Sequence, residues 1–437
     1  MSEREYPRQV AQFQKETPGA EGVAVATTKR LLNGTFMLDI GLDLKPYRPS
    51  YYRRSTRVDL IKKWAGVKFD GVPSYTAFPT IFNCLYKRIA PTTPGGTLPR
   101  DWVWEQSSTA PETIDTLTIE KGDHNGVERA AGCFFTGWAM NGNESDIGFS
   151  AEGMGRAISN TVDDSIYMST REIQTVDLSG GNDPTGGTWL LTILGQQTTA
   201  LAHNASAAAV QAAINILPAT GAADVTVTLV GFVYTINFPV YLGNVATVTV
   251  DSTSLTGTGL TITITTTQPG IGASDIADRP LIPTHIKWYA DTTSGGLGVT
   301  ALTRVLGWSM GDSNMRALFW TVNRDNAGAA AGKADSEEPS FEITLDVEND
   351  TAGAAFYTKA KAGTSIFLRF EALDAVDSIE SSYRYQAIFD FHCKVKALSE
   401  YKVNQNLYSY TVTLEVCHDA TWGKSMSLAN RNALTTV

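Results

Sequence analysis

The chain has 437 residues, of which 43% are hydrophobic, and a formal net charge of −10. That length allows two or three compact domains, and the hydrophobic fraction excludes disorder of the whole chain. The acidic balance argues against a protein that grips nucleic acid through a broad basic surface. No run of about 18 apolar residues occurs, so no transmembrane helix is expected.

The N-terminus lacks the basic and then apolar segments of a signal peptide. We therefore expect the protein to be made in a cytoplasm and kept there until assembly. In that reducing compartment its cysteines are expected to be free thiols. They are Cys84, Cys133, Cys393 and Cys417.

Residues 1–34 are polar and show no periodicity, which predicts an arm with no core of its own. Regular patterning begins near 35–40. A helix is predicted at 79–88, because apolar residues recur there at helical spacing. They are Phe78, Ile81, Phe82, Leu85 and Ile89.

Residues 174–268 differ in composition from the rest of the chain, because Thr, Val, Ala and Gly dominate and charged residues almost vanish. Apolar residues alternate with threonine at 225–229 and 260–264, which predicts half-buried strands. Asn204 or Ser206 is expected to cap a helix that precedes them. The apolar side of that helix is Val210, Ala213, Ile214 and Leu217. We predict a self-contained module here.

Charged and aromatic residues return after this module. Apolar and polar residues alternate at 341–348, 385–395 and 408–416, which predicts long antiparallel strands with one wet face. A short helix is predicted at 353–362, with an N-cap just ahead of Gly353 and Gly363 as C-cap.

The order of predicted elements is the same in both flanks of the module. The first flank has a strand at 66–69, the helix, strands at 102–104 and 116–120, and a hairpin from 132–140 to 147–152. The second flank has a strand at 341–347, the helix, a strand at 366–370, and a hairpin from 385–398 to 408–416. Element order alone, and no residue identity, supports this equivalence. If each chain contains two copies of the unit, three chains close a ring that would take six chains with one copy each. The sheets of neighbouring units can then continue into one another without free edges.

Short segments of both flanks resemble the tail tube proteins of siphophages, the bacteriophages with long flexible tails. In the first flank they are 116–123 (TLTIEKGD), 129–133 (RAAGC) and 152–157 (EGMGRA). In the second they are 281–286 (LIPTHI), 302–306 (LTRVL), 383–385 (YRY) and 419–424 (DATWGK). The middle segment resembles a module found as an insertion in phage structural proteins, through 187–191 (GTWLL), 195–199 (GQQTT) and 204–213 (NASAAAVQAA).

The resemblance implies a mainly β fold with two tandem tail-tube-type β-sandwich or barrel units, each with a short helix. The implied division is an N-terminal arm at 1–34, a first unit at 35–173, an inserted α+β, β-rich decoration module at 174–268, and a second unit at 269–437.

The function that the resemblance implies is structural: rings stacked into the tail tube, the conduit for DNA ejection, and not an enzyme. We expect a homotrimeric, pseudo-six-fold ring, with the tape measure, tail terminator and distal tail proteins as other partners. DNA would pass through the lumen without specific binding. The protein would lie in the virion tail, assembled in the host bacterial cytoplasm, with no membrane contact, cofactor, metal or catalytic residue. A distal tail or baseplate hub protein, or a carbohydrate-binding adhesion protein, stays open as an alternative.

Gly307–Gly311 matches the G-x-S-x-G nucleophile elbow, with Ser309 as the candidate nucleophile. That motif requires a helix after the serine, whereas 315–322 predicts a strand, so a hairpin is favoured over a hydrolase. No Walker A loop, G-x-G-x-x-G fingerprint or H-E-x-x-H motif occurs.

Two clusters carry possible metal ligands. His392 and Cys393, with Cys417 and His418, could bind zinc. Alternation, however, predicts Cys393 and His418 on the apolar faces of their strands and the other two on the polar faces, which argues against a common site. Asp346, Glu348 and Asp350 could form a calcium site, but a solvated or lumen-facing strand is favoured.

One patch combines basic and aromatic residues. An interface with an acidic neighbouring subunit is favoured, because interfaces are rich in Tyr and Arg. DNA contact and an ordinary exposed loop are the alternatives. The patch consists of Tyr47, Arg48, Tyr51, Tyr52, Arg53, Arg54, Arg57, Lys62 and Lys63.

Overall fold

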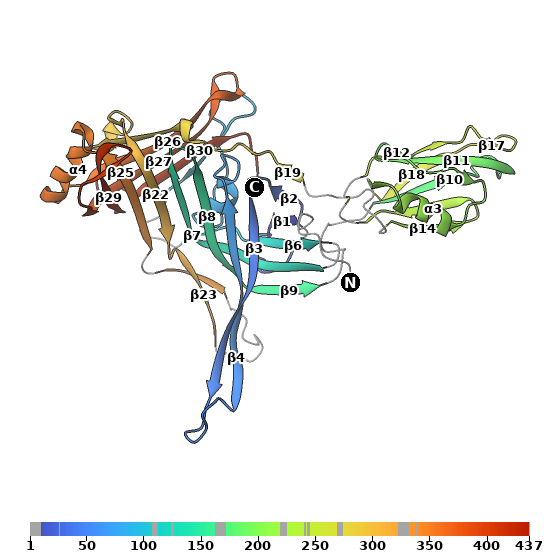
Figure 1. Ribbon diagram of the computed structural model, residues 1–437, viewed down its shortest axis with the longest axis horizontal. Helices are drawn as coiled ribbons and strands as arrows, with labels where there is room; N and C mark the ends of the chain where they lie inside the picture. The colour runs from blue at the N-terminus through green and yellow to red at the C-terminus, as the bar shows by residue number, and fades with distance from the viewer. Residues whose placement is uncertain are drawn as a thin grey trace.

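The computed structural model describes residues 10–25, 27–106, 112–123, 126–161, 172–218, 225–239, 242, 245–268, 274–321, 332–336 and 339–436. The fold is mainly β, with few helices, as predicted. Figure 1 shows a large body formed by the two flanks of the chain and a smaller module formed by its middle.

The first flank contains one short helix, α1 (Phe78–Phe82). It is shorter than the predicted helix at 79–88, because the Asn83 side chain bonds to both the N–H and the C=O of Ile89 and turns the chain. The strands are β1 (Val10–Lys15), β2 (Lys29–Leu31), β3 (Gly34–Tyr47), β4 (Arg57–Gly71), β5 (Arg100–Trp104), β6 (Leu117–Asp123), β7 (Gly126–Asn143), β8 (Ile147–Gly155) and β9 (Ala157–Thr161).

The second flank contains the helix α4 (Thr351–Ala362). Asp350 caps it by accepting from Gly353 N at 2.7 Å, and Gly363 ends it at φ 64°, so both predicted caps are confirmed. The strands are β19 (Ser274–Ile276), β20 (Ile286–Asp291), β21 (Ala301–Leu302), β22 (Val305–Ser313), β23 (Arg316–Phe319), β24 (Gly332–Asp335), β25 (Ser340–Glu348), β26 (Ile366–Glu380), β27 (Tyr383–Leu398), β28 (Lys402–Asn404), β29 (Leu407–Val416) and β30 (Met426–Asn432). The 3₁₀ turns η4 (Pro283–His285) and η5 (Ser294–Gly296) complete the flank.

One pattern of strand pairing occurs twice in the body. In the first flank the antiparallel series is β1–β6–β7–β8–β4–β3, and β9 also pairs with β7. In the second flank it is β20–β26–β27–β29–β25–β22, and β30 also pairs with β27. We call these sets the first unit and the second unit. The duplicated order of elements predicted from the sequence is therefore visible in the pairing.

The register aligns the two units residue by residue. β7 pairs with β6 as far as Cys133, and β27 pairs with β26 as far as Cys393. Each long strand then changes partner and has a register irregularity, at 135–137 and at 395–397. Cys133 and Cys393 are therefore equivalent, and both are buried free thiols. This is a residue identity that the order of elements did not provide.

The two units share one hydrophobic core. Phe78 of α1 contacts Phe389 of β27 with ring centroids 5.6 Å apart, and Trp138 of β7 contacts Phe341 of β25 at 5.7 Å. The predicted division at 35–173 and 269–437 therefore separates two repeats, but it does not separate two cores.

The prediction of an N-terminal arm is wrong for the described part of residues 1–34. β1 pairs with β6 along its whole length, and Phe13 is fully buried. The buried Glu16 carboxylate accepts hydrogen bonds from Gly22 N, Thr116 Oγ1 and Gly132 N, each at 2.7 Å. The segment is polar in sequence and still buried, because its polar groups are satisfied by hydrogen bonds, and polarity alone had predicted an arm. Residues 1–9 lie outside the described residues.

The module has its own core, and its described strands pair only with one another. Ser206, one of the two predicted caps, accepts from Ala209 N at 3.2 Å. Ile173 pairs with Gln268, so the first and last strands of the module are neighbours. Its elements are β10 (Ile173–Asp177), β11 (Gly186–Ile193), β12 (Gln196–Gln197), β13 (Leu201–Ala202), α3 (Ala207–Asn215), β14 (Thr226–Val230), β15 (Val233–Asn237), β16 (Thr249–Asp251), β17 (Leu255–Thr256) and β18 (Thr263–Gln268).

Candidate assembly surfaces

The two units are joined edge to edge by β7 and β22, which pair from Asp312↔Trp138 to Gly307↔Asn143. We call this pairing the internal seam. Tyr86 Oη donates to Asp312 Oδ2 at 2.7 Å and accepts from Trp138 Nε1 at 2.7 Å. All three side chains are buried, so the backbone ladder is reinforced by a hydrogen-bonded network inside the core.

The internal seam contains a titratable group. Burial raises the pKa of Asp312 to about 7, although the hydrogen bond from Tyr86 opposes the shift. Burial also raises the pKa of Tyr86, so its hydroxyl stays protonated and able to donate. The sequence alone does not predict this network, because nothing in the local sequence links three residues that lie so far apart in the chain.

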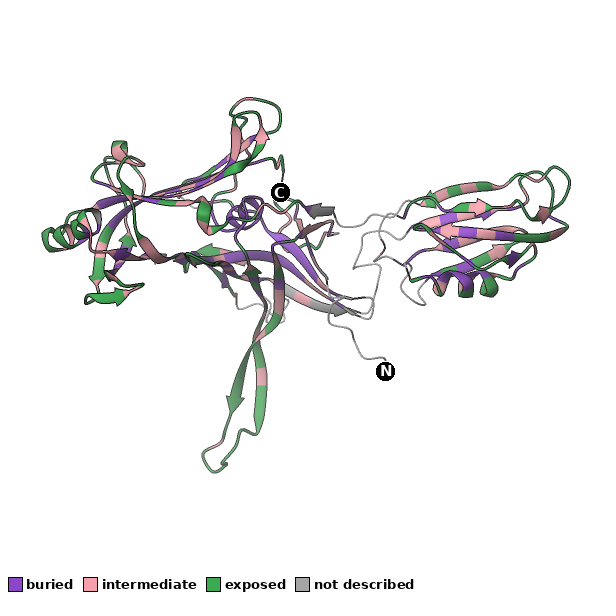
Figure 2. Ribbon diagram, turned by 45° about the horizontal axis from the view of Figure 1, so that its top comes forward, coloured by how far each residue is buried: buried purple, intermediate pink, exposed green. Residues whose placement is uncertain are grey.

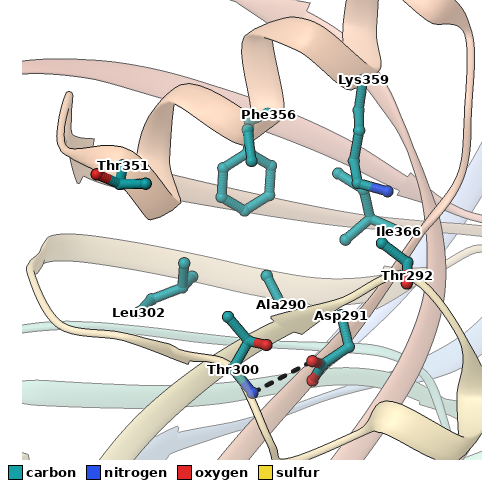
Figure 3. Close-up of a pocket in the computed structure, with 10 residues that line it drawn as sticks. Ala290, Asp291, Thr292, Thr300, Leu302, Thr351, Phe356, Lys359 and Ile366 are labelled. Carbon is teal, nitrogen blue, oxygen red and sulfur yellow. Dashed lines mark hydrogen bonds between the residues drawn. The ribbon is translucent and has the colours of Figure 1, made fainter.

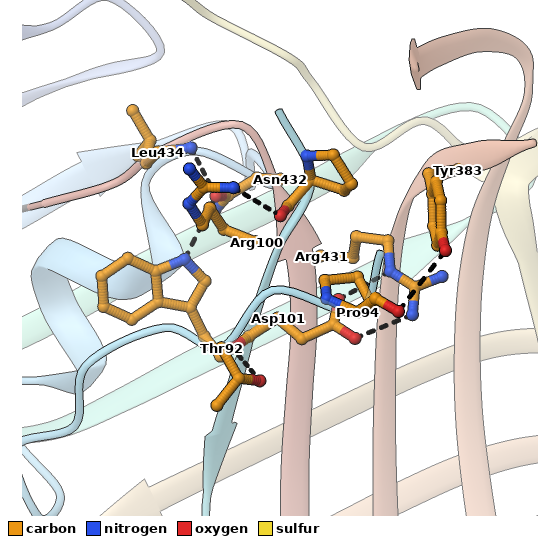
Figure 4. Close-up of polar contacts among 10 residues, drawn as sticks. Thr92, Pro94, Arg100, Asp101, Tyr383, Arg431, Asn432 and Leu434 are labelled. Atoms are coloured by element: carbon orange, nitrogen blue, oxygen red, sulfur yellow. Dashed lines mark hydrogen bonds and ion pairs between the residues drawn. The ribbon is translucent and has the colours of Figure 1, made fainter. Parts of the chain in front are cut away.

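A second connection joins the first flank to the second unit, through the pairing of β5 with β30. Arg431 donates to both carboxylate oxygens of Asp101, from Nε at 2.6 Å and from Nη2 at 2.8 Å (Figure 4). Asn432 donates to the carbonyl of Tyr75 at 2.8 Å and accepts from Trp102 Nε1 at 3.2 Å. Strands of the second unit therefore close over the first unit next to α1.

The hairpin of β3 and β4 projects from the body as a two-stranded ribbon (Figure 2). Ile40, Leu42 and Leu44 alternate along β3, and Leu44 lies opposite Leu60. These side chains are about half exposed, from 47% for Leu60 to 55% for Ile40. An isolated ribbon is marginally stable in water, and an exposed apolar face of this kind marks an interaction site. Such alternation is typical of a strand with one buried face, whereas these side chains are exposed in a single chain.

The predicted basic–aromatic patch lies on this hairpin, at the end of β3, in the tip and along β4. Tyr51 is 82% exposed, and its ring contacts that of Tyr52 at 4.6 Å. Residues 45–63 include seven basic residues and one acidic residue, Asp59, in a chain with a net charge of −10. The hairpin is therefore a basic element of an acidic protein, suited to contact with an acidic surface.

The helix α4 lies at an open edge of the body. A cavity of about 380 Å³ separates it from β20 and β21. Phe356, Leu302 and Ile366 form its apolar lining, and Asp291 there accepts from Thr300 N at 3.2 Å (Figure 3). Among the described residues of α4, Gly353 and Phe356 are buried and the others are half-buried or exposed.

Ser309 lies within β22, on an exposed position between two strands that both pair with β22. The strand continues through Ser313, because 307–312 pair on both sides, so Gly307–Gly311 forms neither the turn that lifts a nucleophile nor the predicted hairpin turn. The next strand, β23, lies within the segment 315–322 that was predicted as a strand.

The structure brings together two of the four candidate zinc ligands. The faces of the two histidines are the reverse of those predicted. His392 is buried with its ring 4.9 Å from that of Phe367, and His418 is exposed because the chain leaves β29 at Val416. Cys417 Sγ lies 3.4 Å from His392 Nδ1, but Asp419 approaches the opposite ring nitrogen at 3.7 Å. Burial raises the pKa of Cys417, which disfavours a thiolate ligand or nucleophile.

The three candidate calcium ligands have separate partners. Asp346 accepts from Asn404 Nδ2 at 2.8 Å, Glu348 forms an ion pair with Arg304 at 2.8 Å, and Asp350 caps α4. No group of three or more His, Cys, Asp or Glu residues converges on a metal position within the described residues. The described part of the chain also contains no helix that is long and apolar enough to cross a membrane.

Comparisons with known proteins give little more. No family model matches the chain, and no curated protein matches it. A solved structure described as Mycobacterium phage Patience is similar over 32% of this chain and 59% of its own, with 20% sequence identity. Its TM-score of 0.16 is too low for an argument about fold or role. The chain is thus similar in part to a phage protein.

Proposed function

We propose that this chain is a phage structural protein that assembles with copies of itself into stacked rings and forms a tail tube, through which DNA leaves the capsid. The carrying observation is the projecting hairpin, whose apolar side chains are about half exposed in one chain and whose tip carries the 82% exposed Tyr51. A ribbon of this kind gains stability when another subunit covers it.

The duplicated unit supports the same proposal. Two copies of one pairing pattern already lie edge to edge in a single chain, so three chains would supply six units to a closed ring. The net charge of −10 suits a lumen past which DNA slides, since attractive contacts repeated in every ring would add up to a trap. The other proposed partners are the tape measure, tail terminator and distal tail proteins, and the proposed location is the virion tail.

The test is negative-stain electron microscopy of the concentrated protein, seeded with tail fragments if needed. Hollow filaments of even width are expected, with three-fold or pseudo-six-fold symmetry. Isolated rings would favour a distal tail or baseplate protein, and monomers at all concentrations would reject self-assembly.

A matched pair of variants tests the hairpin itself. Leu42→Asp with Leu44→Asp is expected to abolish filaments and leave the circular dichroism spectrum unchanged, because both side chains are already about half exposed. Ile216→Asp with Val230→Asp changes two exposed apolar residues of the module and is expected to leave filaments intact. Filaments in the hairpin variant would contradict its assigned role.

A further inference from the structure

We propose that the outer edge of β3 pairs with the outer edge of β27 and β28 in a second copy of this chain, and that this junction repeats the internal seam. In the proposed register Ile40 lies opposite Leu398 and Phe36 lies opposite Val403. The inference rests on the proposed function only in requiring that the chain associate with itself.

The two strands are the ends of one series. Pairing across the internal seam connects both units into the order β3–β4–β8–β7–β22–β25–β29–β27. Within the described residues, β3 has no strand on its second side, and β27 has none beside 394–398 on the side away from β29. These edges lie at opposite ends of the series and do not pair with each other in one chain, so a second copy is needed to bring them together.

Rows of directly opposed residues give the register. Trp138 and Leu398 are equivalent, because each follows the irregularity in its strand and pairs with the equivalent residue of β8 or β29. The row of the first unit is Phe36, Phe69, Ala151 and Trp138. The row of the second unit is Trp308, Leu345, Val412 and Leu398.

The internal seam shows which residue of the neighbouring unit lies next to the last residue of such a row. Asp312 pairs with Trp138, and it follows Trp308 by four residues. The equivalent residue of the first unit is Ile40, four residues after Phe36. Ile40 of one chain therefore belongs beside Leu398 of the next. A second pair of residues fixes the register. Gly142 pairs with Trp308 across the internal seam and with Ile147 of β8, and the equivalent of Ile147 in β29, Tyr408, pairs with Val403. Val403 is therefore the equivalent of Gly142 and belongs beside Phe36, the equivalent of Trp308.

The side chains along both edges are consistent with a missing partner. Ile40 is 55% exposed and Val403 is 73% exposed, although both are apolar residues in strands. Asp312, the equivalent of Ile40 at the internal seam, is buried. The position is thus covered where the neighbouring unit is present and open where it is not.

The helices show the same difference. All residues of α1 are buried, because the second unit closes over it through Phe389 and the β5–β30 pairing. The equivalent helix, α4, borders the cavity shown in Figure 3. In the chain described, no unit follows the second one to cover α4.

The stagger of the seam also fits a closed sheet. The row that starts at Phe36 crosses four strands and reaches Trp138. Across the seam it meets Asp312, which lies four residues after Trp308, the equivalent of Phe36. The register thus shifts by four residues for every four strands. With about 3.4 Å per residue and about 4.8 Å between strands, this corresponds to a strand tilt of roughly 35°, the value found in barrels. The stagger of the seam is therefore compatible with a closed sheet.

Cysteine cross-linking tests the register in a Cys417→Ser background, since the other three native cysteines are buried. Directly opposed residues of antiparallel strands lie about 4.5–5.5 Å apart, within disulfide range. Ile40→Cys with Leu398→Cys is expected to give covalent dimers and trimers after mild oxidation, since three chains would close the ring. A mixture of the two single variants is expected to give dimers only. Ile40→Cys with Val403→Cys is the out-of-register control and is expected to remain mostly monomeric.

A second measurement separates this inference from the proposed function. Ile40→Lys is expected to lower the sedimenting assembled fraction at least tenfold, because a lysine on an edge strand opposes pairing, whereas Val376→Lys, at an 87% exposed site, leaves it unchanged. Filaments that form without the Ile40–Leu398 cross-link would overturn the junction and leave the tube intact. A wild-type chain that never assembles would overturn both.

Discussion

The helices α1 and α4 occupy equivalent places in two copies of one unit, but their surroundings differ. Each follows the equivalent strand, β4 or β25. The helix α1 is wholly buried beneath strands of the second unit, whereas most of α4 is exposed. Burial of the helix in this fold therefore depends on whether another unit lies beside it.

The largest difference is expected between Phe82→Ala and Phe356→Ala. The ring of Phe82 contacts Trp138 at 5.2 Å and Trp104 at 5.3 Å, so its removal should cost about 3–5 kcal/mol of unfolding free energy. Phe356 borders an open cavity, so its removal in the unassembled chain should cost about 2 kcal/mol. Urea denaturation at low protein concentration measures both values. Equal losses would contradict the contrast between the two helices.

The internal seam is expected to make stability depend on pH. The pKa of Asp312 is raised to about 7 in the fold from 3.8, so its protonated form stabilises the folded chain fully below about pH 4. That stabilisation is lost as pH rises through 7, at most about 4 kcal/mol in all.

Asp312→Asn should remove this loss, because an amide oxygen still accepts from Tyr86 and does not ionise. Melting temperatures of both proteins from pH 5 to 8 measure the effect. The variant should change less with pH than the wild type, and parallel curves would show that Asp312 does not titrate in this range.

The smallest effect concerns the caps. The helix α4 has a side-chain N-cap and α1 has none, so the exposed helix depends on local hydrogen bonds in place of cover. Asp350→Ala should therefore cost about 1 kcal/mol. Thr351→Ala, at the first helical residue, is the matched control and should cost less. Thermal unfolding compares them, and an unchanged melting temperature for Asp350→Ala would show that α4 does not depend on its cap.

Sequence patterns predicted what is local in this fold. Alternation located the strands at 341–347 and 408–416, and residue type located Asp350 and Gly363 at the ends of α4. These features depend on neighbours in the chain, through side-chain period and backbone conformation.

The features that the sequence did not reveal depend on which strands lie side by side. A period of two shows which face of a strand is buried, but it does not identify the strand at its edge. The pairing of β7 with β22 and the place of β1 beside β6 were therefore missed. For the same reason the apolar alternation of Ile40, Leu42 and Leu44 does not identify what would cover these side chains, which are about half exposed in one chain.

The pairing of Ile173 with Gln268 gives the middle module an unusual independence. The first and last residues of the module therefore lie side by side, so the chain enters and leaves this domain at one place. Excision of 174–267 would leave two ends already close together, so rejoining them would require little loop-closure entropy. The same point could receive another small domain with neighbouring termini, which makes it a suitable position for fusing a foreign domain to this protein.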